Sequence, residues 1–69
     1  MQQISDRIRE ARTRNGWTQT QVEAWADLPA SVVAQFEAGT RTPSAANLTK
    51  LAKGLRVSSD WLLGIENDS

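Results

Sequence analysis

The sequence predicts an all-α fold built from five short helices. Apolar residues recur three and four positions apart in several segments, which is the spacing of one face of a helix. No segment shows the period-two alternation of apolar and polar residues that a half-buried strand requires. Ser, Thr, Gly and Pro stand between these segments, where they suit the starts and ends of helices.

The first predicted helix covers residues 3–14 and ends at Asn15-Gly16. Its apolar stripe consists of Ile4, Ile8 and Ala11. The second covers residues 18–26, and it opens with Thr18 and Gln21 in the T-x-x-Q pattern of a capping box. Val22 and Ala26, four positions apart, share its inward face.

The third predicted helix covers residues 29–38 and follows a tight turn over residues 27–29. Pro29 suits the first helical position, where no backbone N–H is needed. Val33 and Phe36 form the inward face of this helix. Gly39 ends it, because glycine readily adopts the left-handed conformation of a helix cap.

The fourth predicted helix covers residues 45–55, begins after the capping residue Ser44, and has an apolar stripe of Leu48, Leu51, Ala52 and Leu55. A short fifth helix runs from Ser59 to Leu63, between the cap Ser58 and Gly64. Together the helices predict one domain over residues 1–64, followed by a flexible tail over residues 65–69.

The composition excludes several classes of function. The chain has 69 residues, no Cys and no His, and it offers neither a Gly-rich phosphate loop nor a metal-ligand cluster. We therefore expect no enzymatic activity, no cofactor and no metal. No apolar run reaches the length of a membrane span and no secretory signal is present, so we expect a cytoplasmic protein with no membrane partner.

The net charge is zero, but the charged residues are unevenly distributed. The charge is +2 over residues 1–22, −3 over residues 23–38, +4 over residues 39–56 and −3 over residues 57–69. Two basic blocks therefore flank an acidic middle. This arrangement suits a protein that clamps a phosphate backbone, although ordinary solvated helix faces can have the same composition.

The two helices over residues 18–38 have the layout of a helix-turn-helix, whose second helix can enter the DNA major groove. The whole chain resembles the Xre/Cro family, the DNA-binding domains of lambdoid phage repressors and their bacterial relatives. The matching motifs are Arg7-Ile8-Arg9 with Arg12, Trp17-Thr18-Gln19, Val33 with Phe36-Glu37-x-Gly39, Arg41-x-Pro43-Ser44, and the run from Leu48 to Gly64. The resemblance implies a compact five-helix domain that binds operator DNA, often as a two-fold dimer.

Two residues depart from the family pattern. Glu23 stands where many members have a small Ala at the crossing of the two helices, and Asp27 stands where Gly is usual in the turn. Asp tolerates a positive φ better than most residues. Glu23 must reach solvent or find a partner, because an unpaired buried carboxylate is costly.

We expect the third helix to present Ala30, Ser31, Ala34 and Gln35 to DNA bases, on the side away from its apolar face. Gln35 can bond adenine bidentately, Ser31 can bond several bases, and Ala30 can touch a thymine methyl group. For Ser31 the alternative is a hydrogen bond to its own backbone. Val32 is expected at the border between the core and the groove.

By resemblance, a second group of residues contacts the DNA backbone: Thr18, Gln19, Thr40, Arg41, Thr42 and Ser44. Gln19 lies at a helix start, where its amide and the free N–H groups favour a phosphate. The hydroxyl groups and the guanidinium of residues 40–42 are suitable donors. The alternatives are an ordinary surface role for Gln19 and helix capping alone for Ser44.

The resemblance also implies an inward ion pair between Arg12 and Glu37, the alternative being two unrelated surface charges. It further implies a small two-fold contact through Leu62 and Leu63, with the apolar Ile65 close by in sequence, and hence a weak homodimer that DNA strengthens. Trp17 and Trp61 are expected in the core, and Leu62, unlike Leu63, is also needed there. Trp25 is expected to be half-exposed, either against the first helix or in contact with a partner.

These observations predict a sequence-specific DNA-binding transcriptional regulator, specifically a repressor that binds a palindromic operator as a dimer through its third helix. Double-stranded DNA is the expected partner, and no small-molecule ligand is expected. The alternative is a protein-binding module of the antitoxin or anti-regulator type, because the acidic stretch over residues 23–38 and Trp25 suit a protein partner.

Overall fold

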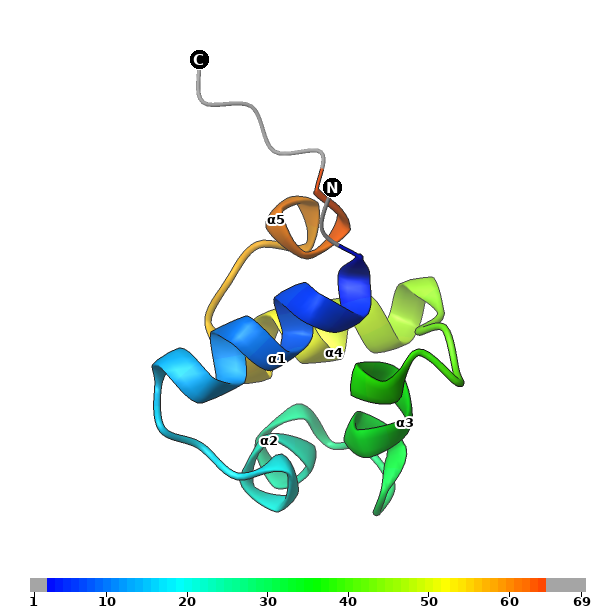
Figure 1. The fold of residues 1–69 in the computed structure, drawn as a ribbon. Coiled ribbons are helices and arrows are strands. Elements are labelled where there is room, and N and C mark those ends of the chain that lie inside the picture. Colours follow the sequence, from blue (N-terminus) through cyan, green and yellow to red (C-terminus); the bar gives the residue numbers. More distant parts are fainter. Residues whose placement is uncertain (1–2, 65–69) are drawn as a thin grey trace.

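The computed structural model describes residues 3–64, which form five α-helices and no strand (Figure 1). The helices are α1 (Ile4–Arg14), α2 (Gln19–Ala26), α3 (Val32–Ala38), α4 (Ala45–Leu55) and α5 (Ser59–Leu63). The predicted all-α fold is therefore confirmed, and every helix except the third begins and ends within one residue of its predicted bounds. The predicted tail over residues 65–69, including Ile65, lies outside the described residues.

α1 and α4 lie across the middle of the molecule, with other helices on either side of them (Figure 1). α2 and α3 lie together at one end, where α2 packs on α4 and α3 packs on α1. α5 lies at the opposite end and contacts both α1 and α4. None of the helices within residues 3–64 combines the length and the apolar character needed to cross a membrane.

The hydrophobic core takes at least one fully buried side chain from every helix: Ile8, Val22, Val33, Phe36, Leu51, Leu55 and Leu62. Val32 is also buried, with 2% of its surface exposed, so its predicted place at the border of core and groove is wrong. The reason is that α3 begins at Val32 and turns this side chain inward. Trp17 and Trp61 pack against the edge of the core and are partly buried.

Side chains cap the helices as the sequence predicts. Thr18 Oγ1 accepts a hydrogen bond from the Gln21 N–H at 3.1 Å, and Gln21 Oε1 accepts one from the Thr18 N–H at 2.9 Å. This reciprocal pair is the predicted capping box of α2. Ser44 and Ser58 cap α4 and α5, and each hydroxyl oxygen accepts one backbone N–H of the first turn. Backbone donors at the starts of three helices are thereby satisfied without any tertiary contact.

The turn between α2 and α3 is longer than predicted. α3 begins at Val32, so the prediction that Pro29 occupies the first helical position is wrong. Asp27 ends α2 with a φ of 57°, as expected of a residue that tolerates the left-handed region. Ser31 also has a positive φ, 71°, and this second left-handed residue delays the start of the helix. Pro29 therefore lies within the turn.

Glu23 explains why α3 begins at Val32. Its Oε2 accepts a hydrogen bond from the buried backbone N–H of Val33 at 3.1 Å, and the residue is only 7% exposed. Val33 is the second residue of α3, so a carboxylate from α2 satisfies one of its free N–H groups and meets the positive end of its dipole. The buried Glu23 thus has the partner that its position requires.

Gly54 allows α4 to approach α2 closely. A Cβ atom built on Gly54 would lie 3.0 Å from the Cβ of Ala26, which is closer than such atoms normally come. A side chain here would therefore push the two helices apart.

At the other end of the molecule, Arg7 attaches α5 to α1. Arg7 Nη1 donates to the Trp61 carbonyl oxygen at 2.9 Å, and its guanidinium lies 4.9 Å from the centre of the Trp61 ring.

Candidate nucleic-acid interface

The outer face of α3, together with the two residues before the helix, carries no charge. Ala30, Ser31 and Gln35 are exposed and Ala34 is partly exposed, whereas Val33 and Phe36 face the core. Between residues 30 and 38 no exposed side chain is a carboxylate. The Ser31 hydroxyl makes no capping hydrogen bond to α3. We call the surface formed by Ala30, Ser31, Ala34 and Gln35 the α3 face.

Behind the α3 face, Glu37 is held by a cluster of donors from α1 and α2. Arg12 donates from Nε to Glu37 Oε2 at 2.6 Å and from Nη2 to Oε1 at 3.0 Å, a bidentate pair in which the side chains are 16% and 3% exposed. The structure thus places the two residues of the expected ion pair in direct contact. The hydrogen bond with Glu37 raises the pKa of the Arg12 guanidinium above its ordinary value.

Two further hydrogen bonds surround this ion pair. Arg9 Nη2 donates to the Glu37 carbonyl oxygen at 2.9 Å, and Arg12 Nη1 donates to the Trp17 carbonyl oxygen at 2.9 Å. Arg12 therefore joins α1, the start of α2 and the last turn of α3. Arg9, whose Nε also lies 3.7 Å from Glu37 Oε1, shares with Arg12 the role of holding this end of α3.

Gln19 lies between the start of α2 and α3. Its Nε2 donates to Glu37 Oε1 at 3.1 Å, a contact that no motif in the sequence indicates. One N–H of the amide and its carbonyl oxygen remain for another partner. The Gln19 side chain is thus oriented by the same carboxylate that holds Arg12, and its position at the first turn of α2 is the one that phosphate binding would need.

The acidic stretch over residues 23–38 is largely internal. Glu23 and Glu37 are 7% and 5% exposed, and each accepts hydrogen bonds from the protein. Within this stretch the carboxylate of Asp27 alone belongs to an exposed residue. Of the three negative charges in this stretch, only that of Asp27, in the turn before α3, therefore lies on an exposed residue.

The loop after α3 carries exposed donors next to the α3 face. Thr40, Arg41 and Thr42 are exposed, and Arg41 Nη1 lies 3.5 Å from Gln35 Oε1. Thr40 Oγ1 donates to the Gln35 carbonyl oxygen at 3.3 Å. Ser44 is exposed at the start of α4, where its hydroxyl oxygen accepts the Asn47 N–H at 3.2 Å. The guanidinium of Arg41 and the amide of Gln35 are therefore neighbours on one surface.

Only one of the two expected dimer residues is available. Leu62 is 0% exposed and belongs to the core, so the prediction that it contacts a second copy is wrong. Leu63 is 47% exposed at the end of α5. Because a five-residue helix packs on one side, it turns Leu62 inward and leaves Leu63 in solvent.

Trp25 is 52% exposed and packs on Trp17, which lies between α1 and α2. The two ring centres are 4.9 Å apart and the ring planes meet at 75°, an edge-to-face arrangement that aromatic pairs prefer. The half-exposure of Trp25 agrees with the sequence-based expectation, whereas its aromatic partner could not be foreseen.

Comparison with known proteins accounts for this architecture. A helix-turn-helix family model matches residues 8–62. The chain belongs to the helix-turn-helix family. The match covers all five helices apart from the first turn of α1 and the last residue of α5. The comparison with curated proteins gives no match.

Solved structures of the same family superpose closely on the chain. The P22 c2 repressor protein in complex with synthetic operator 9T gives a TM-score of 0.87 at 27% identity, covering 96% of this chain and 100% of that chain. The restriction-modification controller protein C.AhdI from Aeromonas hydrophila gives 0.83 at 33% identity, covering 87% and 91%. The controller protein C.Esp1396I gives 0.77 at 25% identity, covering 86% and 77%. The resemblance to lambdoid repressors is confirmed.

Proposed function

We propose that this protein is a sequence-specific DNA-binding transcriptional regulator that places α3 in the major groove. The similar P22 c2 repressor was solved in complex with a synthetic operator, and the two other similar proteins are named restriction-modification controller proteins. The proposal also rests on the geometry around α3, which combines a polar uncharged face with helix starts and a basic loop at its edges.

The absence of exposed carboxylates from residues 30–38 is the observation that carries the proposal. DNA presents a dense row of phosphates, so an acidic surface around α3 would repel it. Because Glu23 and Glu37 are bonded inside the domain, the acidic stretch that favoured a protein-binding module contributes little surface charge. The geometry therefore supports DNA over a protein partner for the α3 face.

The proposed roles of individual residues follow from their positions. Gln35 is exposed on α3, where its amide can bond adenine bidentately, and Ser31 and Ala30 lie at the start of the helix for contacts with neighbouring bases. Ala34 allows close approach of the helix. The backbone contacts come from Thr18 and Gln19 on one side, and from Thr40, Arg41, Thr42 and Ser44 on the other.

We further propose that the protein acts as a repressor and binds a palindromic operator as a dimer. Leu63, exposed at the end of α5, is the apolar residue that a two-fold contact would bury. Such a contact is small, so association in solution is weak and two DNA half-sites strengthen it. The two α3 helices would then read half-sites about 34 Å apart, one turn of DNA.

Selection of bound sequences from random duplexes tests this function. We expect enrichment of a palindrome with half-sites about one helical turn apart. The matched control is Gln35→Glu, which is nearly isosteric but places a carboxylate on the α3 face, and which should fold normally and enrich no sequence. A pool that shows no enrichment with the native protein, or the same enrichment with the variant, would overturn the proposed use of α3.

A further inference from the structure

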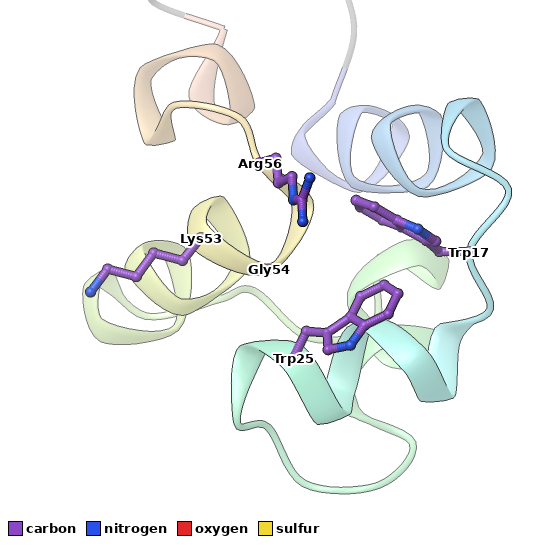
Figure 2. A pocket seen from close by; sticks show the side chains of 5 residues that line it. All are labelled: Trp17, Trp25, Lys53, Gly54 and Arg56. Atoms are coloured by element: carbon purple, nitrogen blue, oxygen red, sulfur yellow. The ribbon is translucent and has the colours of Figure 1, made fainter.

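A hollow of about 430 Å³ lies between α2 and the end of α4, lined by Trp17, Trp25, Lys53, Gly54 and Arg56 (Figure 2). Its volume falls within the range of about 300–1,000 Å³ that small-molecule sites occupy. It is separate from the α3 face and the loop before α4. α4 has 11 residues, and the hollow is at its carboxyl end whereas Ser44 is at its start. A helix of that length separates the two by about 16 Å.

Two of the five residues that line the hollow are tryptophans. Trp17 and Trp25 pack edge to face, with ring centres 4.9 Å apart. Figure 2 shows the two rings near each other, across the hollow from Arg56. Trp25 is 52% exposed, an unusual state for so large an apolar side chain. Gly54 contributes backbone rather than a side chain to the floor. The hollow therefore offers an apolar surface suited to a flat ring system.

Arg56 supplies an unpaired positive charge at the rim. Figure 2 shows its side chain extending toward the indole rings, whereas Lys53 extends away from them. Within residues 3–64 neither cation forms an ion pair, and no carboxylate lines the hollow. A neighbouring hollow beside Trp61 differs, because Arg14 there is paired with Glu10. The Arg56 guanidinium is therefore free to receive an anion.

The backbone of Arg56 adds an independent observation. It follows α4 as its cap with a φ of 60°, in the left-handed region that favours glycine. Glycine would be the more stable residue for this cap, yet the chain has an arginine there, and its side chain lines the same hollow as Trp17 and Trp25. A side chain kept in an unfavourable backbone conformation is a reason to look for a use of that side chain.

We propose that this hollow binds a small anion with a flat apolar body, the simplest being an aromatic carboxylate. The ring of the ligand lies against Trp17 and Trp25, and its carboxylate pairs with Arg56. This departs from the sequence-based expectation of no small-molecule ligand. The reason is that the site forms where two distant parts of the chain, residues 17–25 and residues 53–56, come together, so no local motif indicates it.

The test uses 2-naphthoate as the probe and 2-naphthamide as its uncharged analogue. The chain has three tryptophans, so three indole N–H signals can be followed by NMR and assigned with single Trp→Phe variants. We expect 2-naphthoate to shift the Trp17 and Trp25 signals saturably, with a Kd below about 1 mM, and to leave the Trp61 signal in place. 2-Naphthamide should bind at least about tenfold more weakly.

Arg56→Gly is the decisive variant, because glycine suits the left-handed cap and the fold should remain intact. We expect it to weaken 2-naphthoate binding at least about tenfold, whereas Lys53→Gln should change it less than about threefold. Three results would overturn the proposal: no saturation by either probe, equal affinity for the two probes, or unchanged affinity in Arg56→Gly. Equal affinity would indicate a merely apolar patch, of the kind that contacts proteins. The titration contains no DNA, so its failure leaves the proposed function intact.

Discussion

Glu23 of α2 and Val33 of α3 are joined across the turn by a hydrogen bond of 3.1 Å from the Val33 N–H to the Glu23 carboxylate. A side chain from one helix thus caps the next, where a family member with Ala at this position has no such acceptor. The bond fixes both the start of α3 and its angle to α2. The position of the α3 face relative to α2 therefore depends on a buried acid.

Replacing Glu23 should therefore cost stability. We expect Glu23→Ala to lower the free energy of unfolding by about 1–3 kcal/mol, because a buried N–H loses its acceptor. Glu23→Gln should cost less, since the amide oxygen can still accept. Urea denaturation measures both, with Thr20→Ala on the exposed side of α2 as the control. A loss in Glu23→Ala no larger than in the control would contradict this role.

The cluster around Glu37 predicts a strong and non-additive effect. Arg12→Met should lower the free energy of unfolding by about 3–5 kcal/mol, because Glu37 is left charged in a site where it is 5% exposed. Adding Glu37→Gln should recover part of that loss. Arg14→Met, which removes an exposed pair with Glu10, should cost less than about 0.5 kcal/mol. Simple additivity of the two changes would show that the pair is not coupled.

Asp27 provides a test of the turn. Its φ of 57° is unfavourable for any residue with a Cβ, so Asp27→Gly should be more stable than Asp27→Ala by about 1 kcal/mol. Comparing these two variants cancels the loss of the carboxylate, which both share. Thermal unfolding followed by circular dichroism gives the difference. Equal melting temperatures would mean that the turn relaxes to another conformation.

Leu63 tests assembly. Because it is 47% exposed, Leu63→Glu should leave the melting temperature nearly unchanged while sharply reducing affinity for a palindromic operator. Leu62→Ala is the structural contrast, and it should cost about 2–5 kcal/mol of stability because Leu62 is fully buried. Unreduced operator affinity in Leu63→Glu, or a native footprint over a single half-site, would argue against this dimer.

Local signals in the sequence predict most of this fold. The Thr18–Gln21 capping box, the caps Ser44 and Ser58 and the left-handed Gly39 act within one helix turn, so they can be read from neighbouring residues. The start of α3 could not be read in this way. It depends on Glu23, ten positions away from Val33, and on Ser31 adopting a conformation that serine rarely adopts.

The candidate site likewise combines features that local sequence predicts with features that depend on residues distant in the chain. Exposure of Ala30, Ser31 and Gln35 follows from the period of a helix with Val33 and Phe36 inward. The contact of Gln19 with Glu37 could not be foreseen, because it requires the packing angle of α2 and α3. The prediction for Leu62 was wrong for a related reason. The sequence already favours Leu62 over Leu63 for the core, but the resemblance extends the two-fold contact to both, and a fully buried Leu62 has no surface left for it.

The difference between Gln35→Ala and Arg41→Ala is the most direct test of the central claim, that α3 reads DNA bases while the loop after it holds the backbone. Affinities should be measured on the selected operator and on scrambled duplexes over a range of salt concentrations. Gln35→Ala should lose about 1–3 kcal/mol on the operator alone and relax the preference at one position. Arg41→Ala should weaken binding to every duplex and reduce the salt slope by about one. Identical behaviour of the two variants across sequences would contradict the account.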